Sequence, residues 1–126
     1  MATIQHKLNK DVVRGEQVVV ATWPTLTNSG ADVGAALCLA DYGDKTFQVF
    51  GTLGAAGAVA IEGSNDGVNW CAISNRQGTA MSFTALSMNT SQDRPAFVRP
   101  RITAGDGTTS LTVTCAAHRS DLGVIG

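Results

Sequence analysis

The stretch Ile61–Trp70 constrains the fold more than any other part of the sequence, because it has the composition of a β-hairpin. Its centre is Asp66-Gly67, a pair that accepts the positive backbone dihedrals of a tight turn. Before the turn, Val59 and Ile61 alternate with Ala60 and Glu62, which is the period of a strand with one buried face. We expect Trp70 to anchor the returning strand in the core. The stretch therefore predicts an antiparallel hairpin.

The same combination of short apolar strands and polar turns recurs along the chain. The sequence has 14 glycines and a charged fraction of only 15%, against about a quarter in average proteins, which is typical of a turn-rich β protein. Residues 111–117 show the clearest alternation of apolar and threonine positions, and residues 46–53 show it too. We predict an all-β fold, an antiparallel β-sandwich or jelly roll of about eight short strands with an extended N-terminal arm.

A chain of 126 residues has the size of one domain with a single core. We assign residues 1–15 to an N-terminal arm, residues 16–119 to the β-sandwich domain and residues 120–126 to a C-terminal tail. The arm is polar and carries Lys7, Lys10 and Arg14. Two interpretations of it stay open: a frayed terminus, or an arm that becomes ordered on a neighbouring subunit.

Two prolines bear on the predicted strands. Pro24 follows the valine-rich residues 16–23 and is expected to end the first core strand, because proline has no backbone donor. Pro100 lies in the middle of residues 96–103 and predicts that this segment is an edge strand or contains a bulge.

The three cysteines do not form a complete disulfide framework, because their number is odd. Cys115 shares its strand phase with Leu111 and Val113, which predicts a small buried side chain. We expect three free thiols and folding in a reducing cytosol. The alternative is that two of the three cysteines form one disulfide bond. The beginning of the sequence does not resemble a signal peptide, and the longest apolar stretch, residues 34–40, is too short to span a bilayer. We therefore expect no export and no membrane association.

Catalytic and metal-binding patterns are missing from the sequence. His6 and His118 are not in a metal-ligand spacing with cysteine or with each other. There is no G-x-S-x-G motif, and the glycines after Gly51 lack the Gly-Lys-Thr/Ser of a phosphate-binding loop. The net charge of −1 argues against nucleic-acid binding. We expect no enzymatic activity, no cofactor and no metal.

Contact with other protein is the role that the composition favours, because the predicted surface is poor in charge. Arginine beside an aromatic residue is frequent at the energetic centres of protein interfaces, and a solvated strand face is the alternative interpretation of the same residues. The candidate interface residues are Phe50, Arg94, Phe97, Arg99 and Arg101 together with Lys7, Lys10 and Arg14 of the arm.

The ordered segments 47–52, 59–70, 94–100 and 105–115 resemble small virion proteins of tailed bacteriophages. Within that group the resemblance implies a capsid decoration, or cement, protein: a jelly roll that holds neighbouring subunits of the phage major capsid protein from outside, on a virion assembled in the host cytoplasm. The run Ser64-Asn65-Asp66-Gly67-Val68-Asn69-Trp70 also resembles a hairpin of discoidin-like carbohydrate-binding sandwiches. The alternative is therefore a component of the tail, fibre or head-tail connector, including a carbohydrate-binding module.

Self-association is expected as well. Phe50 is an apolar residue on the polar face of its predicted strand, and the apolar composition indicates more buried surface than one small domain offers. We predict a homo-dimer or homo-trimer. The N-terminal arm and the predicted edge strand Phe97–Ile102 are the candidates for contact with the shell or with sibling subunits.

Overall fold

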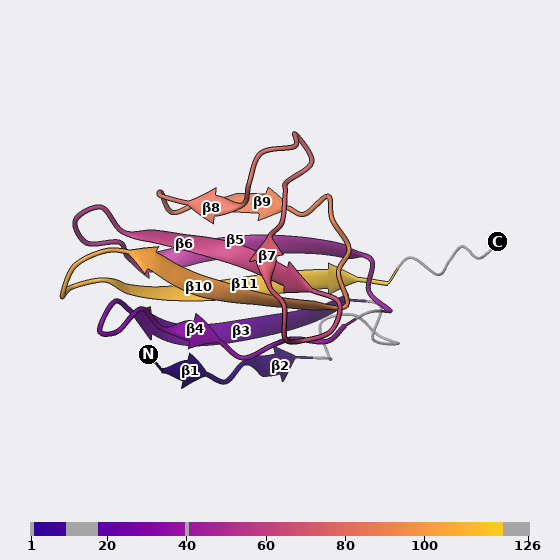
Figure 1. The fold of residues 1–126 in the computed structure, drawn as a ribbon, viewed down its shortest axis with the longest axis horizontal. Coiled ribbons are helices and arrows are strands. Elements are labelled where there is room, and N and C mark those ends of the chain that lie inside the picture. Colours follow the sequence, from indigo (N-terminus) through magenta and orange to yellow (C-terminus); the bar gives the residue numbers. More distant parts are fainter. Residues whose placement is uncertain (1, 10–17, 40, 120–126) are drawn as a thin grey trace.

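The chain folds into two β-sheets that pack face to face (Figure 1). The computed structural model describes residues 2–9, 18–39 and 41–119, and the elements assigned within them are all strands. The six-stranded sheet has the order β1 (Thr3–Ile4), β4 (Val33–Gly34), β10 (Phe97–Ala104), β6 (Ala58–Ser64) and β7 (Cys71–Ala72), and β8 (Ser82–Phe83) also pairs with β6. The five-stranded sheet has the order β2 (Lys7–Asn9), β3 (Val18–Thr27), β11 (Ser110–His118), β5 (Asp44–Thr52) and β9 (Met88–Thr90).

The strand connections are those of a jelly roll. From β3 to β6 and from β9 to β11, each strand lies in the opposite sheet from the one before it. The pairings within the described residues are antiparallel, apart from the parallel pair of β1 and β4. This confirms the predicted all-β sandwich. The number of strands exceeds the prediction because several, such as β4 and β7, contain only two residues.

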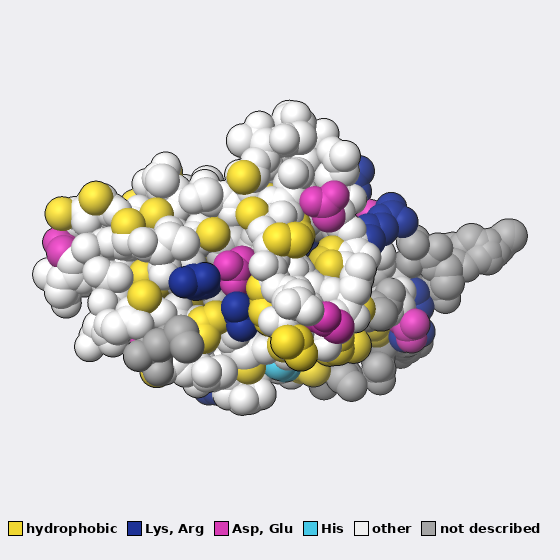
Figure 2. Space-filling model, in the orientation of Figure 1, with side chains coloured by type: hydrophobic (Ala, Val, Ile, Leu, Met, Phe, Trp, Pro, Cys, Tyr) yellow, Lys and Arg dark blue, Asp and Glu magenta, His cyan; other side chains and the backbone are white. Residues whose placement is uncertain are grey.

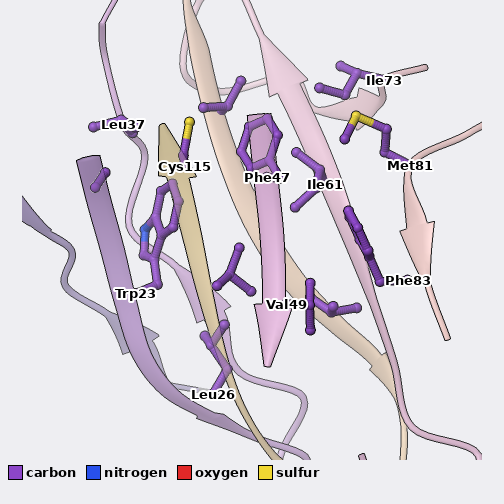
Figure 3. Packing of buried hydrophobic residues seen from close by; sticks show 14 of the residues in the cluster. Trp23, Leu26, Leu37, Phe47, Val49, Ile61, Ile73, Met81, Phe83 and Cys115 are labelled. Carbon is purple, nitrogen blue, oxygen red and sulfur yellow. The ribbon is translucent and has the colours of Figure 1, made fainter. Parts of the chain in front are cut away.

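The core lies between the sheets and is made of inward-facing side chains from both (Figure 3). Trp23 and Phe47 are fully buried, and the indole nitrogen of Trp23 donates to the carbonyl of Ala35 at 2.9 Å. That hydrogen bond matters because a buried N–H without a partner is costly. Cys115 is also fully buried, as its strand phase predicted.

The hairpin predicted at Ile61–Trp70 is present, but its turn is wider than expected. Strands β6 and β7 pair with Glu62 opposite Ala72, and Gly67 has the positive φ, 77°, that the turn required. The prediction that Trp70 anchors the core is wrong. Trp70 is only half-buried, because it lies in the loop before β7 instead of on an inward position of the strand.

Pro24 does not end its strand, which continues to Thr27. The register between β3 and β11 shifts at this point, because Trp23 pairs with Val113 and Leu26 pairs with Leu111. Two residues of β3, Pro24 and Thr25, therefore lie opposite the single residue Thr112 of β11. A bulge of this kind leaves one residue outside the pattern of hydrogen bonds between the strands, so the missing N–H of a proline is tolerated there.

The prediction that Phe97–Ile102 is an edge strand is also wrong, whereas the alternative, a bulge, agrees with the register shift of β10 against β6 between Ile102 and Ala104. Strand β10 lies between β4 and β6 and pairs with β6 along most of its length. The backbone of Val98 bonds Leu37, and the Ile102 N–H bonds the Asp32 carbonyl, so this side of β10 faces the β4 segment. Since the backbone N–H groups of alternate residues point the same way, the backbone nitrogen of Pro100, which has no hydrogen to donate, also faces the β4 segment. A short, interrupted partner strand tolerates a proline there.

The described part of the N-terminal arm is extended, as predicted, but it is not free of the domain. Strand β1 pairs in parallel with β4, with Ile4 opposite Gly34, and Leu8 of β2 pairs with Ala21 in the five-stranded sheet. Unpaired strand edges bind extended chain readily, and here residues 2–9 bind to both sheets of their own domain.

Candidate interaction surfaces

An arginine-carboxylate cluster lies on the outer face of the six-stranded sheet. Nε of Arg99 is 3.0 Å from Oε1 of Glu62, and a guanidinium nitrogen of Arg101 is 3.4 Å from Oε2 of the same carboxylate. The three side chains come together because Arg99 is paired with Glu62 across β10 and β6, and Arg101 lies two residues further along β10. Figure 2 shows basic and acidic side chains close together near the middle of this view.

The loop between β6 and β7 lies against the same cluster. The guanidinium carbon of Arg99 is 4.0 Å from the centre of the Trp70 ring, a cation–π contact. A Cβ placed on Gly67 would lie 3.6 Å from the Phe97 ring. Phe97 and Arg99 therefore support the hairpin loop of their own chain, while Arg101, with 48% of its side chain exposed, is the more accessible member of the predicted arginine pair.

Asp66 holds the loop in shape. Its carboxylate accepts hydrogen bonds from the backbone N–H of Asn69 and Val68, both at 2.8 Å, and from the Asn69 amide and the Ser64 hydroxyl. These bonds favour the charged form and hold the pKa of Asp66 well below its usual range. The residue thus acts as the turn former that the sequence predicted.

Arg94 lies at one end of the sandwich, away from the arginine-carboxylate cluster. A guanidinium nitrogen is 3.6 Å from Oδ1 of Asp44, which also binds Arg76 at 3.0 Å. Arg94 lines three hollows, of about 560, 460 and 280 Å³. The largest is lined by the polar residues Asn65, Asp66, Asn69 and Asp93 and by apolar residues that include Ile73 and Pro95.

Lys45 is buried at this end of the sandwich, a position that the sequence analysis did not single out. It is 4% exposed, and its Nζ donates to the carbonyl of Tyr42 at 2.6 Å. Burial disfavours the charged amine and lowers the pKa of Lys45. The alternation that placed Phe47 in the core also assigns Lys45 to the inner face, so the signal was present in the sequence.

The outer face of the five-stranded sheet is rich in threonine. Two rows cross it from strand to strand, one with Ala116 between Val20 and Thr46, the next with Thr114 between Thr22 and Gln48. We call it the threonine face, and its members on β3, β11, β5 and β9 are Val20, Thr22, Thr46, Gln48, Phe50, Met88, Thr90, Thr112, Thr114 and Ala116.

Two large apolar side chains are exposed on the threonine face. Phe50 is 44% exposed and Met88 is 57% exposed. Phe50 was predicted at this position, whereas Met88 was missed because no strand was predicted at the position of the short strand β9. Among the described residues, charged side chains occur only at the margins of the face, at Lys7 on β2 and Asp44 at the end of β5.

The predicted interface residues do not form one surface. Phe97, Arg99 and Arg101 lie together on the six-stranded sheet, Arg94 lies at the end of the sandwich, and Phe50 lies on the opposite sheet. Lys7 is exposed on β2 at the edge of the threonine face, and Lys10 and Arg14 lie outside the described residues.

Two further features bear on binding. The described residues contain no group of three or more His, Cys, Asp or Glu side chains that could hold a metal ion. Trp23 and Tyr42 are 0% and 5% exposed, so neither ring is available to stack against a sugar.

The described part of the chain also has no helix that is long and apolar enough to cross a membrane.

Comparison with known proteins gives matches in structure alone. No model of a protein family matches the sequence, and no curated protein does. The SPBc2 prophage-derived protein YomS superposes with a TM-score of 0.54 at 10% identity, over 79% of this chain and 93% of YomS. The PBSX exported protein XepA superposes with a TM-score of 0.55 at 17% identity, over 78% of this chain and 38% of XepA.

The fold is therefore shared with prophage proteins. It corresponds to nearly the whole of YomS and to a part of the longer XepA. A cupin protein from Bacteroides fragilis is a weaker match, with a TM-score of 0.48 at 14% identity over 96% of this chain and 80% of the cupin.

Proposed function

We propose that this chain is a non-enzymatic structural protein of a phage particle, which binds the outer capsid surface and stabilises contacts between major capsid subunits. The observation that carries the proposal is the threonine face. It presents Phe50 and Met88, both about half exposed, on a sheet face whose described centre carries no charged side chain. Depletion of charge around exposed aromatic and methionine side chains is the composition of interface centres.

The opposite face suits this role less well. There, Arg99 and Glu62 already pair with each other, and Trp70 contacts Arg99. A partner would have to compete with these contacts, whereas the exposed side chains of Phe50 and Met88 are available without rearrangement. Capsid symmetry repeats a contact many times over the particle, so a modest affinity at each site is sufficient. The shared fold with the prophage proteins YomS and XepA supports a phage origin.

The test is co-sedimentation of the purified protein with mature, undecorated phage shells, quantified as copies bound per major capsid subunit. We expect saturation at a fixed, high stoichiometry and shells that resist heat better. Phe50→Asp and Met88→Asp should reduce binding strongly, while the matched variant Arg101→Gln on the other sheet should bind as the wild type does. A few copies per particle, or equal binding by all variants, would contradict the proposal.

A tail, fibre or connector component is the second candidate, and the hollow of about 560 Å³ beside Asn65, Asn69 and Arg94 favours it. Amide, carboxylate and guanidinium groups around one concave surface can recognise a polar ligand such as a glycan. Binding to isolated tails instead of shells, together with a positive glycan screen that Asn69→Ala abolishes, would favour this candidate.

Self-association belongs to the proposal. We expect a dimer or trimer in solution, and analytical ultracentrifugation of the wild type and of Phe50→Asp measures it. If Phe50→Asp dissociates the oligomer and retains binding to shells, the threonine face joins copies of this chain and another surface meets the capsid.

A further inference from the structure

Lys45 is a buried amine that takes part in none of the ion pairs formed among the described residues. Its side chain is 4% exposed and its hydrogen-bond acceptor there is a carbonyl, that of Tyr42, at 2.6 Å. The carboxylates that form ion pairs in the described structure, those of Asp44 and Glu62, pair with arginines. Buried charges in proteins are normally paired, because an isolated ion in the interior loses its hydration without compensation.

Lys45 is one of the residues that line a hollow into which a counter-ion could fit. Its volume is about 460 Å³, and it lies where the turn before β5 meets the segment before β10. A second cation, Arg94, lines the same hollow, together with the side chains of Asn65 and Tyr42. An ammonium ion has three donors, and the Tyr42 carbonyl uses one of them.

The local charge favours an anion. Lys45 and Arg94 supply two positive charges, and Asp41 on the rim supplies one negative charge. Asp44, next to Arg94, is shared with Arg76, so this outer group adds no excess of positive charge. The guanidinium of Arg119 lies 4.8 Å from the centre of the Tyr42 ring and adds to the positive charge beside the hollow. The surplus of positive charge therefore favours a bound anion.

We propose that this hollow is a binding site for a single carboxylate group, held between the ammonium of Lys45 and the guanidinium of Arg94. The planar guanidinium fits a carboxylate with two parallel hydrogen bonds, and the lysine adds a compact charge on the buried side. The carboxylate can belong to a free small acid or to an acidic side chain of another protein, and the chemistry of recognition is the same. The inference does not depend on the capsid role.

Protonation of Lys45 gives a direct readout of this site. Burial lowers the pKa of the amine, and a carboxylate bound beside it would favour the charged form and raise the pKa again. Several other titratable or charged groups lie around the amine and the hollow, and they must be followed in the same titration: Cys38, Asp41, Tyr42, Asp44, Arg94, Cys115 and Arg119.

The experiment is an NMR titration of the isotope-labelled full chain with sodium acetate, against sodium chloride at equal ionic strength. We expect saturable shifts of the Lys45 side chain and the Arg94 guanidinium, and a higher Lys45 pKa in acetate than in chloride. Arg94→Gln should weaken acetate binding about tenfold, and because Arg94 is exposed this variant should fold normally. Arg101→Gln is the matched control and should leave binding unchanged.

Further arms identify the source of the carboxylate and the selectivity of the site. The peptide acetyl-Ala-Asp-amide tests a protein side chain, and tighter binding than acetate would point to a protein partner, whereas weaker binding would point to a free acid. Lys45→Met should abolish binding of both probes. The proposal is overturned if neither probe gives saturable shifts, if Arg94→Gln binds acetate as the wild type does, or if inorganic phosphate binds more tightly than acetate.

Discussion

Glu62 accepts a hydrogen bond from Arg99 at 3.0 Å across the two central strands of the six-stranded sheet. The Glu62 side chain is 14% exposed and that of Arg99 is 24% exposed. Trp70 covers the guanidinium from one side. The pair therefore links the sheet to the hairpin loop in a partly dehydrated environment, unlike an ion pair in open solvent.

Replacement of Arg99 should destabilise the domain. Arg99→Met leaves the Glu62 carboxylate with a weaker set of donors in a largely buried position, and we expect a loss of about 1–3 kcal/mol in the free energy of unfolding. Arg101→Gln is the matched control, since its side chain is half exposed, and should cost less than about 1 kcal/mol. Urea denaturation followed by tryptophan fluorescence measures both, and equal losses would contradict the distinction.

Gly34 is a position where the two sheets leave no room for a side chain. A Cβ there would lie 2.6 Å from Cδ of Pro100 and 2.6 Å from Cδ1 of Trp23. We expect Gly34→Ala to destabilise the protein by about 1–3 kcal/mol, because neither ring can move freely within the packed core. A Cβ on Gly107 would meet nothing within 4 Å, so Gly107→Ala should change the free energy of unfolding by less than about 0.5 kcal/mol. The same denaturation assay checks the pair.

The alternation of side chains allowed much of this architecture to be predicted. Residues 46–50 and 111–117 lie on the faces that their two-residue period indicated, and the Phe50 side chain is exposed as expected. Asp66-Gly67 was also correctly placed in a hairpin loop. These features depend on the backbone preferences of single residues and on the alternation of buried and exposed side chains, and both can be recognised in a short run of consecutive residues.

The failures concern relations between segments far apart in the sequence. A proline excludes a central position only where its backbone nitrogen would face a long neighbouring strand. The nitrogen of Pro100 faces the short β4 segment instead. Trp70 was assigned to the core on its size, but Arg99, brought next to it by β10, gives it a half-buried position at the surface. The partner of Arg99, Glu62, is 37 residues away, and no local pattern connects them.

Acid should destabilise the turn between β10 and β11 through Asp106. Hydrogen bonds from the Thr108 side chain, the Ala55 backbone and the Thr108 backbone lower the pKa of Asp106 to about 2. A group with a depressed folded pKa stabilises the protein above its unfolded pKa, about 3.9, and this contribution is lost as the pH falls toward 2. Asp106→Asn should therefore show a smaller decrease in Tm between pH 5 and pH 2 than the wild type.

A second variant checks the cause of that pH dependence. Thr108→Val keeps the carboxylate and removes the hydroxyl that donates to Asp106 at 2.7 Å. Its Tm should fall less steeply than that of the wild type and more steeply than that of Asp106→Asn. Parallel curves for all three proteins would show that Asp106 does not contribute to the acid sensitivity.

The three cysteines should differ in reactivity. Cys38 and Cys71 are exposed, whereas Cys115 is buried in the core, and burial raises the pKa of its thiol to about 12. Thiolate is the reactive form, so at pH 8 the reduced, folded protein should react with Ellman's reagent at two thiols, and the third should react only in denaturant. Cys115→Ser should remove the slow thiol and leave the fast ones, provided that its Tm shows it to be folded at the assay temperature. If Cys115 reacted in the folded state at a rate similar to that of Cys71, the sandwich would be opening around Phe47 and Trp23 far more often than its packing implies.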